Sequence, residues 1–221
     1  MGQAFFVTAT GTDLGKTYIS ALLCKDLVNT GKKVAYYKAA LSGAQSLSDS
    51  DASYVANYAN LNMVDNVKVS YLFKEPLSPH LASRNVGVTI DKDVIKKDFS
   101  YIKDGHDITL VEGSGGIVCP LCFEKDNTFM LYDMVKMLDL KSLVIADAGL
   151  GTINALATTI DFMSHRDLEI LGIILNNYDK DNLMHQDNLK VIESFTGIKV
   201  VATVAKNGTL NYIDKDLLKR L

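Results

Sequence analysis

Short apolar segments rich in β-branched and aromatic residues recur along the chain, and segments with helical spacing of apolar residues lie between them. The clearest predicted strands are residues 4–8, 33–38, 107–112, 142–147, 169–176 and 199–204. Most are apolar without alternation, which is typical of strands covered on both faces. Helical spacing occurs at residues 16–30, 51–60, 90–103, 128–138, 152–164, 182–196 and 211–220. This alternation predicts a doubly wound α/β fold with a mostly parallel sheet of about seven strands.

Length and composition indicate one domain, residues 1–221, in an ordinary globular protein. The chain has no repeat, low-complexity segment or Pro/Ser-rich linker, and 48% of its residues are hydrophobic. Its net charge of −3 gives no reason to expect nucleic acid as a partner. No apolar run approaches the roughly 20 residues that cross a bilayer. No basic region precedes the first short apolar run, so we expect no secretory signal, no membrane partner and a cytoplasmic location.

The chain contains three cysteines, Cys24, Cys119 and Cys122, which suit a reducing compartment. Cys119 and Cys122 form a C-x-x-C pair, but a zinc site needs two more ligands at suitable spacing and a redox motif should open a helix. Neither condition is met locally, so we expect structural thiols.

Polar or glycine-rich residues follow five of the predicted strands. They are Gly11 to Thr17, Lys38 with Ser42, Glu112 to Gly116, Asp147 to Gly151, and Asn176 with Asn177. In open α/β sheets ligands bind at the carboxyl ends of the strands. The sequence therefore predicts a binding site at this edge of the sheet.

The segment VTATGTDLGKTYIS, residues 7–20, nearly matches a phosphate-binding loop, in which Gly-Lys-Ser/Thr follows a first glycine after four residues. Its glycine stands at Gly11 instead of position 10. A predicted strand precedes the loop and a predicted helix follows it, so helix N–H groups can bind phosphate. Lys16 adds a cation, and the Thr17 hydroxyl can ligate Mg²⁺. The alternative is a turn that contains Gly-Lys-Thr by chance.

Two carboxylates and a second lysine are candidates for the same edge. Glu112 ends a predicted strand before a glycine-rich segment, where a magnesium-binding carboxylate is expected, although it could be a solvated acid. Asp51 could also face the metal or, alternatively, cap the next helix. Lys38 ends a predicted strand, and with Lys16 it suits a reaction that builds negative charge on a transferred phosphoryl group.

Two further segments are open to two interpretations. GLGTIN, residues 149–154, could bind an anion such as a substrate carboxylate or be a plain connection into a helix. Asn176 and Asn177 could read a base edge or form a turn.

In their order and spacing, these segments resemble the dethiobiotin synthetase family over nearly the whole chain. In the family's phosphate loop, five residues separate the first glycine from Gly-Lys-Thr. The segment TATGTDLGKT aligns with this loop without a gap. The other matching segments are YYKAALSG (36–43), SDA (50–52), EPLSPHLAS (75–83), LVEGSGG (110–116), PL (120–121) and GLGTIN (149–154). The resemblance implies a phosphate-loop NTPase fold of the SIMIBI type.

The resemblance also implies a reaction. The substrate 7,8-diaminopelargonic acid takes up CO₂, or bicarbonate, on one amine as a carbamate, which attacks the γ-phosphate of MgATP. The resulting carbamic–phosphoric anhydride is closed to the ureido ring by the second amine. Such a mechanism needs positioning and charge stabilisation and no nucleophilic side chain. Members of the family are homodimers, and the partner subunit's substrate carboxylate is expected at residues 149–154.

The residues that the resemblance assigns fall into four groups. Lys16 and Lys38 are the catalytic residues. The nucleotide-binding residues are Thr12, Asp13, Leu14, Gly15, Lys16, Thr17, Tyr18, Asp51, Glu112, Gly113, Ser114, Gly115, Asn176 and Asn177. The magnesium ligands are Thr17, Asp51 and Glu112. The substrate-binding residues are Ser42, Leu150, Gly151 and Asn154.

The chain departs from the family pattern at three places. Ala9 stands where the family has glycine, and Ala39 where proline is common. Residues 201–213, VATVAKNGTLNYI, lack the proline-containing stretch that packs on the adenine. We therefore expect looser nucleotide selectivity, with nucleoside triphosphates other than ATP accepted.

Two other readings are possible for this sequence. A cobyrinate-type amide synthetase would need a glutaminase domain, for which 221 residues leave no room. A MinD/ParA-type switch ATPase carries a second lysine early in its phosphate loop, and residues 8–12 contain none. The switch reading, a nucleotide-dependent interaction protein, is the main alternative to the synthetase.

Overall fold

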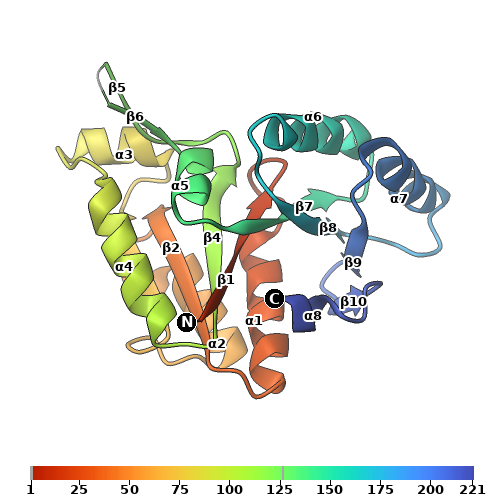
Figure 1. The fold of residues 1–221 in the computed structure, drawn as a ribbon, viewed down its shortest axis with the longest axis horizontal. Helices are drawn as coiled ribbons and strands as arrows, with labels where there is room; N and C mark the ends of the chain where they lie inside the picture. Colours follow the sequence, from red (N-terminus) through yellow and green to blue (C-terminus); the bar gives the residue numbers. More distant parts are fainter. Residues whose placement is uncertain (1, 126) are drawn as a thin grey trace.

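The structure is a computed structural model that describes residues 2–125 and 127–221. Strand β1 (Gln3–Ala9) lies inside an eight-stranded sheet. The strand order is β10-β9-β8-β7-β1-β4-β2-β3 (Figure 1). The bounds are β2 Val34–Ser42, β3 Val67–Phe73, β4 Ile108–Gly116, β7 Lys141–Asp147, β8 Ile170–Asn176, β9 Val200–Val204 and β10 Leu210–Tyr212. Neighbouring strands are parallel except β10, which is antiparallel to β9. The doubly wound, mostly parallel fold is confirmed, with one strand more than expected.

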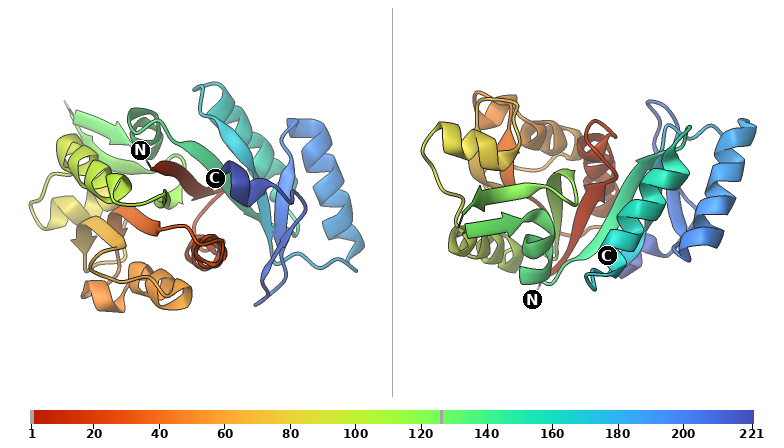
Figure 2. Two further views of the ribbon diagram at one scale, coloured as in Figure 1. Left: turned by 60° about the horizontal axis from the view of Figure 1, so that its bottom comes forward. Right: turned by 90° about the horizontal axis from the view of Figure 1, so that it is seen from above.

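Helices cover both faces of this sheet (Figure 2). The helices on one face are α1 (Lys16–Asn29), α2 (Asp51–Ala59) and the short α8 (Leu217–Arg220). The helices on the other face are α4 (Lys92–Asp104), α5 (Leu131–Met137), α6 (Thr152–Ser164) and α7 (Leu183–Thr196). None of the helices in the described ranges is long and apolar enough to cross a membrane.

The two cores explain why the strands are apolar without alternation. Successive side chains of a strand point to opposite faces of the sheet. In β1, Phe5 and Val7 pack in the core under α1, whereas Phe6 packs in the core on the other face, and all three are buried. Both faces therefore require apolar residues.

A small layer of structure lies at the carboxyl edge of the sheet. It consists of helix α3 (Pro79–Asn85) and a two-stranded antiparallel sheet of β5 (Pro120–Glu124) and β6 (Asn127–Met130) (Figure 1). Arg84 of α3 donates hydrogen bonds to the backbone and side chain of this hairpin. None of these elements was among the predicted ones, and β6 takes the start of the helix expected from residue 128.

Two other predictions of elements were wrong. Strand β3 at the sheet edge was missed because Lys68 and Ser70 interrupt its apolar residues. This segment is a strand because it pairs with β2. The helix expected at 211–220 is instead β10 followed by the single turn of α8. The Tyr212 hydroxyl donates to Asp26 Oδ2 at 2.6 Å, so contacts with α1 and β9 outweigh the local helical spacing.

The packing of β8 against β9 leads to a stability prediction at Gly172. A Cβ atom there would lie 2.3 Å from Val201 Cγ1, and Val201 is buried. We expect Gly172→Ala to lower the free energy of unfolding by about 1–3 kcal/mol, because the core would be overpacked. Urea denaturation measures the loss.

Gly105→Ala is the matched control, since its Cβ would meet no atom closer than 3.9 Å in the described chain and its backbone is right-handed helical. We expect no loss there and a gain of up to about 1 kcal/mol from the stiffer unfolded chain. Equal effects of the two substitutions would contradict the packing argument.

Candidate active site

A cavity of about 700 Å³ opens at the carboxyl ends of β1, β2 and β4. Most of the residues that line it were predicted, and they come from the phosphate loop, β2, the start of α2 and β4. These are Thr12, Asp13, Gly15, Lys16, Thr17, Lys38, Ser42, Asp51, Glu112, Gly113, Ser114 and Gly115. The parallel sheet thus brings together the chemistry that the sequence distributes over a hundred residues.

The phosphate loop runs from the end of β1 to the start of α1 at Lys16. Gly15 precedes the helix with φ of 85°, a left-handed conformation that favours glycine. The first-turn N–H groups of a helix lack intrahelical partners and attract anions. Ala9, where the family has glycine, is the buried last residue of β1, paired with Gly116 and Ile145. Its methyl group packs in the core under α1, so the strand accommodates alanine there.

Lys16 is buried and turned back onto its own loop. Its Nζ donates to the Gly11 carbonyl at 2.8 Å. Burial lowers the pKa of Lys16 from its ordinary value, although the nearby Glu112 carboxylate opposes this effect. A phosphate oxygen would be a stronger partner for this ammonium than a neutral carbonyl.

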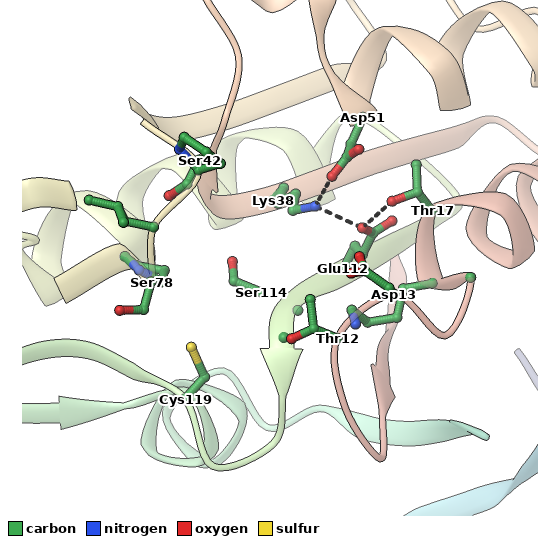
Figure 3. Close-up of a pocket in the computed structure, with 17 residues that line it drawn as sticks. Thr12, Asp13, Thr17, Lys38, Ser42, Asp51, Ser78, Glu112, Ser114 and Cys119 are labelled. Atoms are coloured by element: carbon green, nitrogen blue, oxygen red, sulfur yellow. Dashed lines mark hydrogen bonds and ion pairs between the residues drawn. The ribbon is translucent and has the colours of Figure 1, made fainter. Parts of the chain in front are cut away.

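Lys38 forms ion pairs with two of the carboxylates that line the cavity, Asp51 and Glu112 (Figure 3). Its Nζ lies 2.6 Å from Asp51 Oδ2 and 2.8 Å from Glu112 Oε1. The Thr17 hydroxyl donates to the same Glu112 oxygen at 3.0 Å. Burial lowers the pKa of Lys38, but the charges of Glu112 and Asp51 and their hydrogen bonds raise it above its ordinary value. Lys38 therefore stays charged at neutral pH.

The register of neighbouring strands brings Lys38 close to Glu112. Strands β2 and β4 are parallel neighbours with Tyr37 beside Val111, so Lys38 and Glu112 are the next residues along. Both lie within strands that extend to Ser42 and Gly116, whereas the sequence suggested that they end their strands. Ser50 caps α2 by accepting from the Ser53 amide at 3.4 Å, so Asp51 does not serve as the cap.

Thr17, Asp51 and Glu112 present hard oxygen atoms around one point. Mg²⁺ takes one or two carboxylates together with phosphate oxygens and water. The described residues hold no cluster of three or more His, Cys, Asp or Glu side chains that could bind a metal without such help. The donor set therefore suits a magnesium ion that arrives with a nucleotide.

Gly113 has a packing role besides its place in the cavity wall. A Cβ atom there would lie 2.7 Å from the ring of Phe6 and 3.1 Å from Leu131. The aromatic ring beneath the strand thus excludes a side chain at this position. Gly113 was expected among the nucleotide-binding residues, and the packing of the core is a separate reason for a glycine here.

Some predicted residues lie outside the cavity lining. Asn176 Nδ2 donates to the Leu14 carbonyl at 3.1 Å, and so connects β8 to the phosphate loop. Asn177 adopts a left-handed conformation, and its Nδ2 donates to Asp147 Oδ2 at 2.6 Å. The Tyr18 hydroxyl donates to the Gly208 carbonyl at 2.6 Å. In this structure these groups make contacts within the protein, so base reading remains a prediction.

The predicted substrate residues of GLGTIN form an exposed turn. Leu150 is 94% exposed, and Gly151 and Asn154 are also exposed. Gly151, with φ of 90°, precedes α6. These residues are not in the lining of the cavity, which contains Ser42.

The structure adds two groups of lining residues that the sequence interpretation did not assign. Residues 76–79, Pro-Leu-Ser-Pro, form part of the wall between β3 and α3, and their segment was matched to the family without a role. Cys119 also lines the cavity as a free thiol, and burial raises its pKa to about 11. Cys122 is likewise free, so the two cysteines form no disulfide.

Comparisons with known proteins agree with this site. A family model described as an AAA domain matches residues 3–213. ATP-dependent dethiobiotin synthetase BioD of Brachyspira hyodysenteriae is 45% identical over 98% of this chain and 98% of that protein. The protein of the same name from Clostridium botulinum strain Loch Maree is 46% identical over 90% of this chain and 89% of its own length.

Solved structures with the same fold are more distant in sequence. A ParA family ATPase from Chlorobium tepidum has a TM-score of 0.57 and 14% identity over 93% of this chain and 84% of its own. The septum site-determining protein MinD of Pyrococcus horikoshii has a TM-score of 0.59 and 17% identity over 93% and 82%. These similarities show the phosphate-loop NTPase fold alone.

The fold, the phosphate loop, the two lysines of the cavity, and identity of 45% over nearly the full length of a curated relative lead to one assignment. The chain belongs to the dethiobiotin synthetase family.

Proposed function

We propose that this protein is an ATP-dependent dethiobiotin synthetase that forms dethiobiotin from 7,8-diaminopelargonic acid and CO₂. The observation that carries this proposal is the convergence of Lys16, Lys38 and two carboxylates in one cavity. The family membership supports the same activity, since the relatives bear that name. The similarity to MinD and ParA extends to the fold alone.

The reaction has three balanced steps. One substrate amine adds to CO₂ and loses a proton, which gives a carbamate. A carbamate oxygen attacks the γ-phosphorus of ATP and ADP leaves, so a carbamic–phosphoric anhydride forms. The second amine attacks the carbamate carbon, loses a proton and expels inorganic phosphate, which closes the ureido ring.

The side chains of the cavity suit charge stabilisation in these steps. Lys16, which now donates to the Gly11 carbonyl, would exchange that partner for phosphate oxygens. Lys38 would bind the carbamate and the γ-phosphate, because its ammonium lies in the cavity between β2 and the phosphate loop. Ser42, on the same wall, would contact the carbamate end of the substrate. Thr12, Asp13, Gly15, Ser114 and Gly115 would surround the phosphates.

Thr17, Asp51 and Glu112 would hold magnesium together with the nucleotide. When bound, Mg²⁺ neutralises charge on the phosphates. The hydroxyl of Thr17 and a carboxylate of Glu112 already lie within hydrogen-bonding distance of each other. Asp51 is half exposed toward the cavity, so its second oxygen can turn to a new partner.

We place a second subunit at the exposed turn of residues 149–154. A homodimer would bring Leu150, Gly151 and Asn154 of one subunit to the carboxylate of substrate bound in the other. Their exposure supports this arrangement, since no described part of the same chain covers Leu150. The three free thiols suit a cytoplasmic location, and neither nucleic acid nor a membrane is required.

The base of the nucleotide would lie near Asn176, Asn177 and the segment of residues 201–213. Leu14 and Tyr18 are close to this region, since Leu14 accepts from Asn176 and Tyr18 donates to Gly208. The segment has no proline to pack on adenine, and the described contacts of both asparagine amides are within the protein. Loose selectivity among nucleoside triphosphates follows.

A product assay tests the proposed function. Purified protein with ATP, bicarbonate and 7,8-diaminopelargonate should form dethiobiotin and release phosphate. Lys38→Ala should lower the rate on the order of 100-fold or more, because a cation at the reacting phosphoryl group is removed. Lys68→Ala, at a partly exposed ion pair outside the cavity, should keep the rate. Phosphate release that is indifferent to the diamine would favour a switch ATPase instead.

Stability measurements on Lys38 separate its structural contribution from its role in the reaction. Lys38→Met should lower the free energy of unfolding at pH 7 by about 3–5 kcal/mol, because Glu112 is left buried without its counter-charge. Lys68→Met should cost at most about 1 kcal/mol. Adding Glu112→Gln to Lys38→Met should recover much of the loss.

The same pair sets a pH dependence. The pKa of Lys38 is raised in the folded state, so its stabilisation is present below the ordinary lysine value of about 10.4 and is lost as the pH rises through the folded pKa. A difference between wild type and Lys38→Met that vanishes already at pH 8 would contradict this.

Nucleotide selectivity is tested by turnover with ATP, GTP and CTP. We expect preferences below about a hundredfold, since a base is discriminated strongly only when buried polar groups pair with its edge. A preference for ATP above that value would refute the loose pocket.

A further inference from the structure

The two oxygen atoms of Glu112 are satisfied unequally. Oε1 accepts from Thr17 Oγ1 and from Lys38 Nζ. Oε2 is buried and has no hydrogen-bond partner among the residues that the structure describes. A carboxylate oxygen left this way carries the full desolvation cost of a charged acceptor. This asymmetry raises the question of which donor serves Oε2.

The donor has to come from the protein interior. Thr17 and Lys38 of the cavity lining both bind Oε1, so a ligand in the cavity meets that side of the carboxylate, whereas Oε2 is buried. The interior beneath Glu112 is the core between the sheet and α1. Two buried hydroxyls near this face, Tyr36 and Ser20, have no partner in the described part of the chain.

Tyr36 is the better placed of these two hydroxyls. It lies two residues before Lys38 on β2, so both side chains leave the same face of the sheet. Its register partner on β4 is Leu110, two residues before Glu112, which makes Tyr36 and Glu112 diagonal neighbours. Its side chain is fully buried in the core under α1.

The charge environment makes this hydroxyl a donor to the carboxylate. Burial raises the pKa of Tyr36 well above its ordinary value, and so do the negative charges of Glu112 and Asp51. A phenol carries its proton at neutral pH and a carboxylate does not, so a hydrogen bond between them runs from Tyr36 to Glu112. The Tyr36 hydroxyl and Glu112 Oε2 both lack a hydrogen-bond partner among the described residues, so each could satisfy the other.

We infer that Tyr36 is a positioning residue of the magnesium and phosphate site: its hydroxyl donates to Glu112 Oε2 and keeps Oε1 directed at Thr17 and Lys38. The inference rests on the proposed function, because it assigns a purpose to the orientation of a magnesium ligand. When phosphate draws Lys38 away from Oε1, the contact from Tyr36 still holds the carboxylate in place. Without it the carboxylate can rotate, and metal binding then has to restrain it.

The test compares nucleotide binding with and without magnesium. Calorimetric titration with the non-hydrolysable β,γ-imido analogue of ATP, in excess Mg²⁺ and in EDTA, gives the factor by which magnesium tightens binding. Tyr36→Phe should reduce this factor on the order of tenfold and leave binding in EDTA unchanged. The measurement requires no turnover.

Tyr37→Phe is the matched control. Tyr37 is the next residue and is also buried, but it faces the other core, where its hydroxyl contacts Ser70 Oγ at 2.8 Å and donates to the Ile95 carbonyl at 3.3 Å. This variant should lose stability and keep the magnesium factor. Ser20→Ala, which removes the other buried hydroxyl, should also keep it.

The stability and the nucleotide binding of the variants together test the role of Tyr36. Thermal unfolding is measured alongside, and Tyr36→Phe should lower the melting temperature, because Glu112 Oε2 is left buried without its donor. An unchanged magnesium factor in Tyr36→Phe would overturn this inference and leave the proposed function standing. A magnesium factor that is reduced in Ser20→Ala but not in Tyr36→Phe would do the same. If Tyr36→Phe does not fold, 3-fluorotyrosine at position 36 replaces it, and its more acidic hydroxyl should raise the factor. Wild-type protein that binds no nucleotide would overturn both this inference and the proposed function.

Discussion

The buried ammonium of Lys38 is the interaction on which the rest of the site depends. It neutralises Glu112, which is closed to solvent, and Asp51 at the mouth of the cavity. Two carboxylates this close would repel each other without it, and Glu112 could not remain charged in the core at low cost. The same ammonium is also the cation available to a transferred phosphoryl group. Structural support and chemistry thus use one side chain.

The sheet supplies the precision that this cluster needs. Lys38 and Glu112 stand on hydrogen-bonded neighbouring strands, and Thr17 stands on the first turn of the helix that follows β1. Side chains on such elements are more closely fixed than side chains on loops. The elements at the edge, in contrast, are shorter and more exposed, as Leu150 shows. The site therefore has a rigid half that would bind phosphate and an exposed half that would bind substrate and a second subunit.

The reaction asks for little beyond this arrangement. The nucleophiles belong to the substrate, so the protein has to hold charges and distances instead of forming a covalent intermediate. The described residues around the cavity reflect this: two lysines, three carboxylates, hydroxyls and glycine backbone, with a single thiol, Cys119, whose pKa burial raises to about 11. Tyr36 extends the same principle one layer deeper, from the metal ligand to the residue beneath it.

Much of the fold and of the site could be read from local patterns. The apolar segments predicted six of the sheet's strands because buried strands leave a strong signal, whereas β3 and β10 were missed because edge strands leave a weak one. The phosphate loop, Lys38 and Glu112 stood out because glycine-rich or charged residues follow apolar segments. Cys119 and residues 76–79 gave no such signal, and only their position in the folded chain brings them to the cavity.

The amino-acid sequence by itself was sufficient for the doubly wound class, the phosphate loop and the two lysines, since these depend on residue type and short-range order. The sequence did not predict which charged residues form ion pairs with each other. That Lys38 pairs with both carboxylates, that Ser50 instead of Asp51 caps α2, and that Ala9 packs in the core all follow from contacts between distant segments. Such contacts are set by strand register and by packing against α1, which no local pattern encodes.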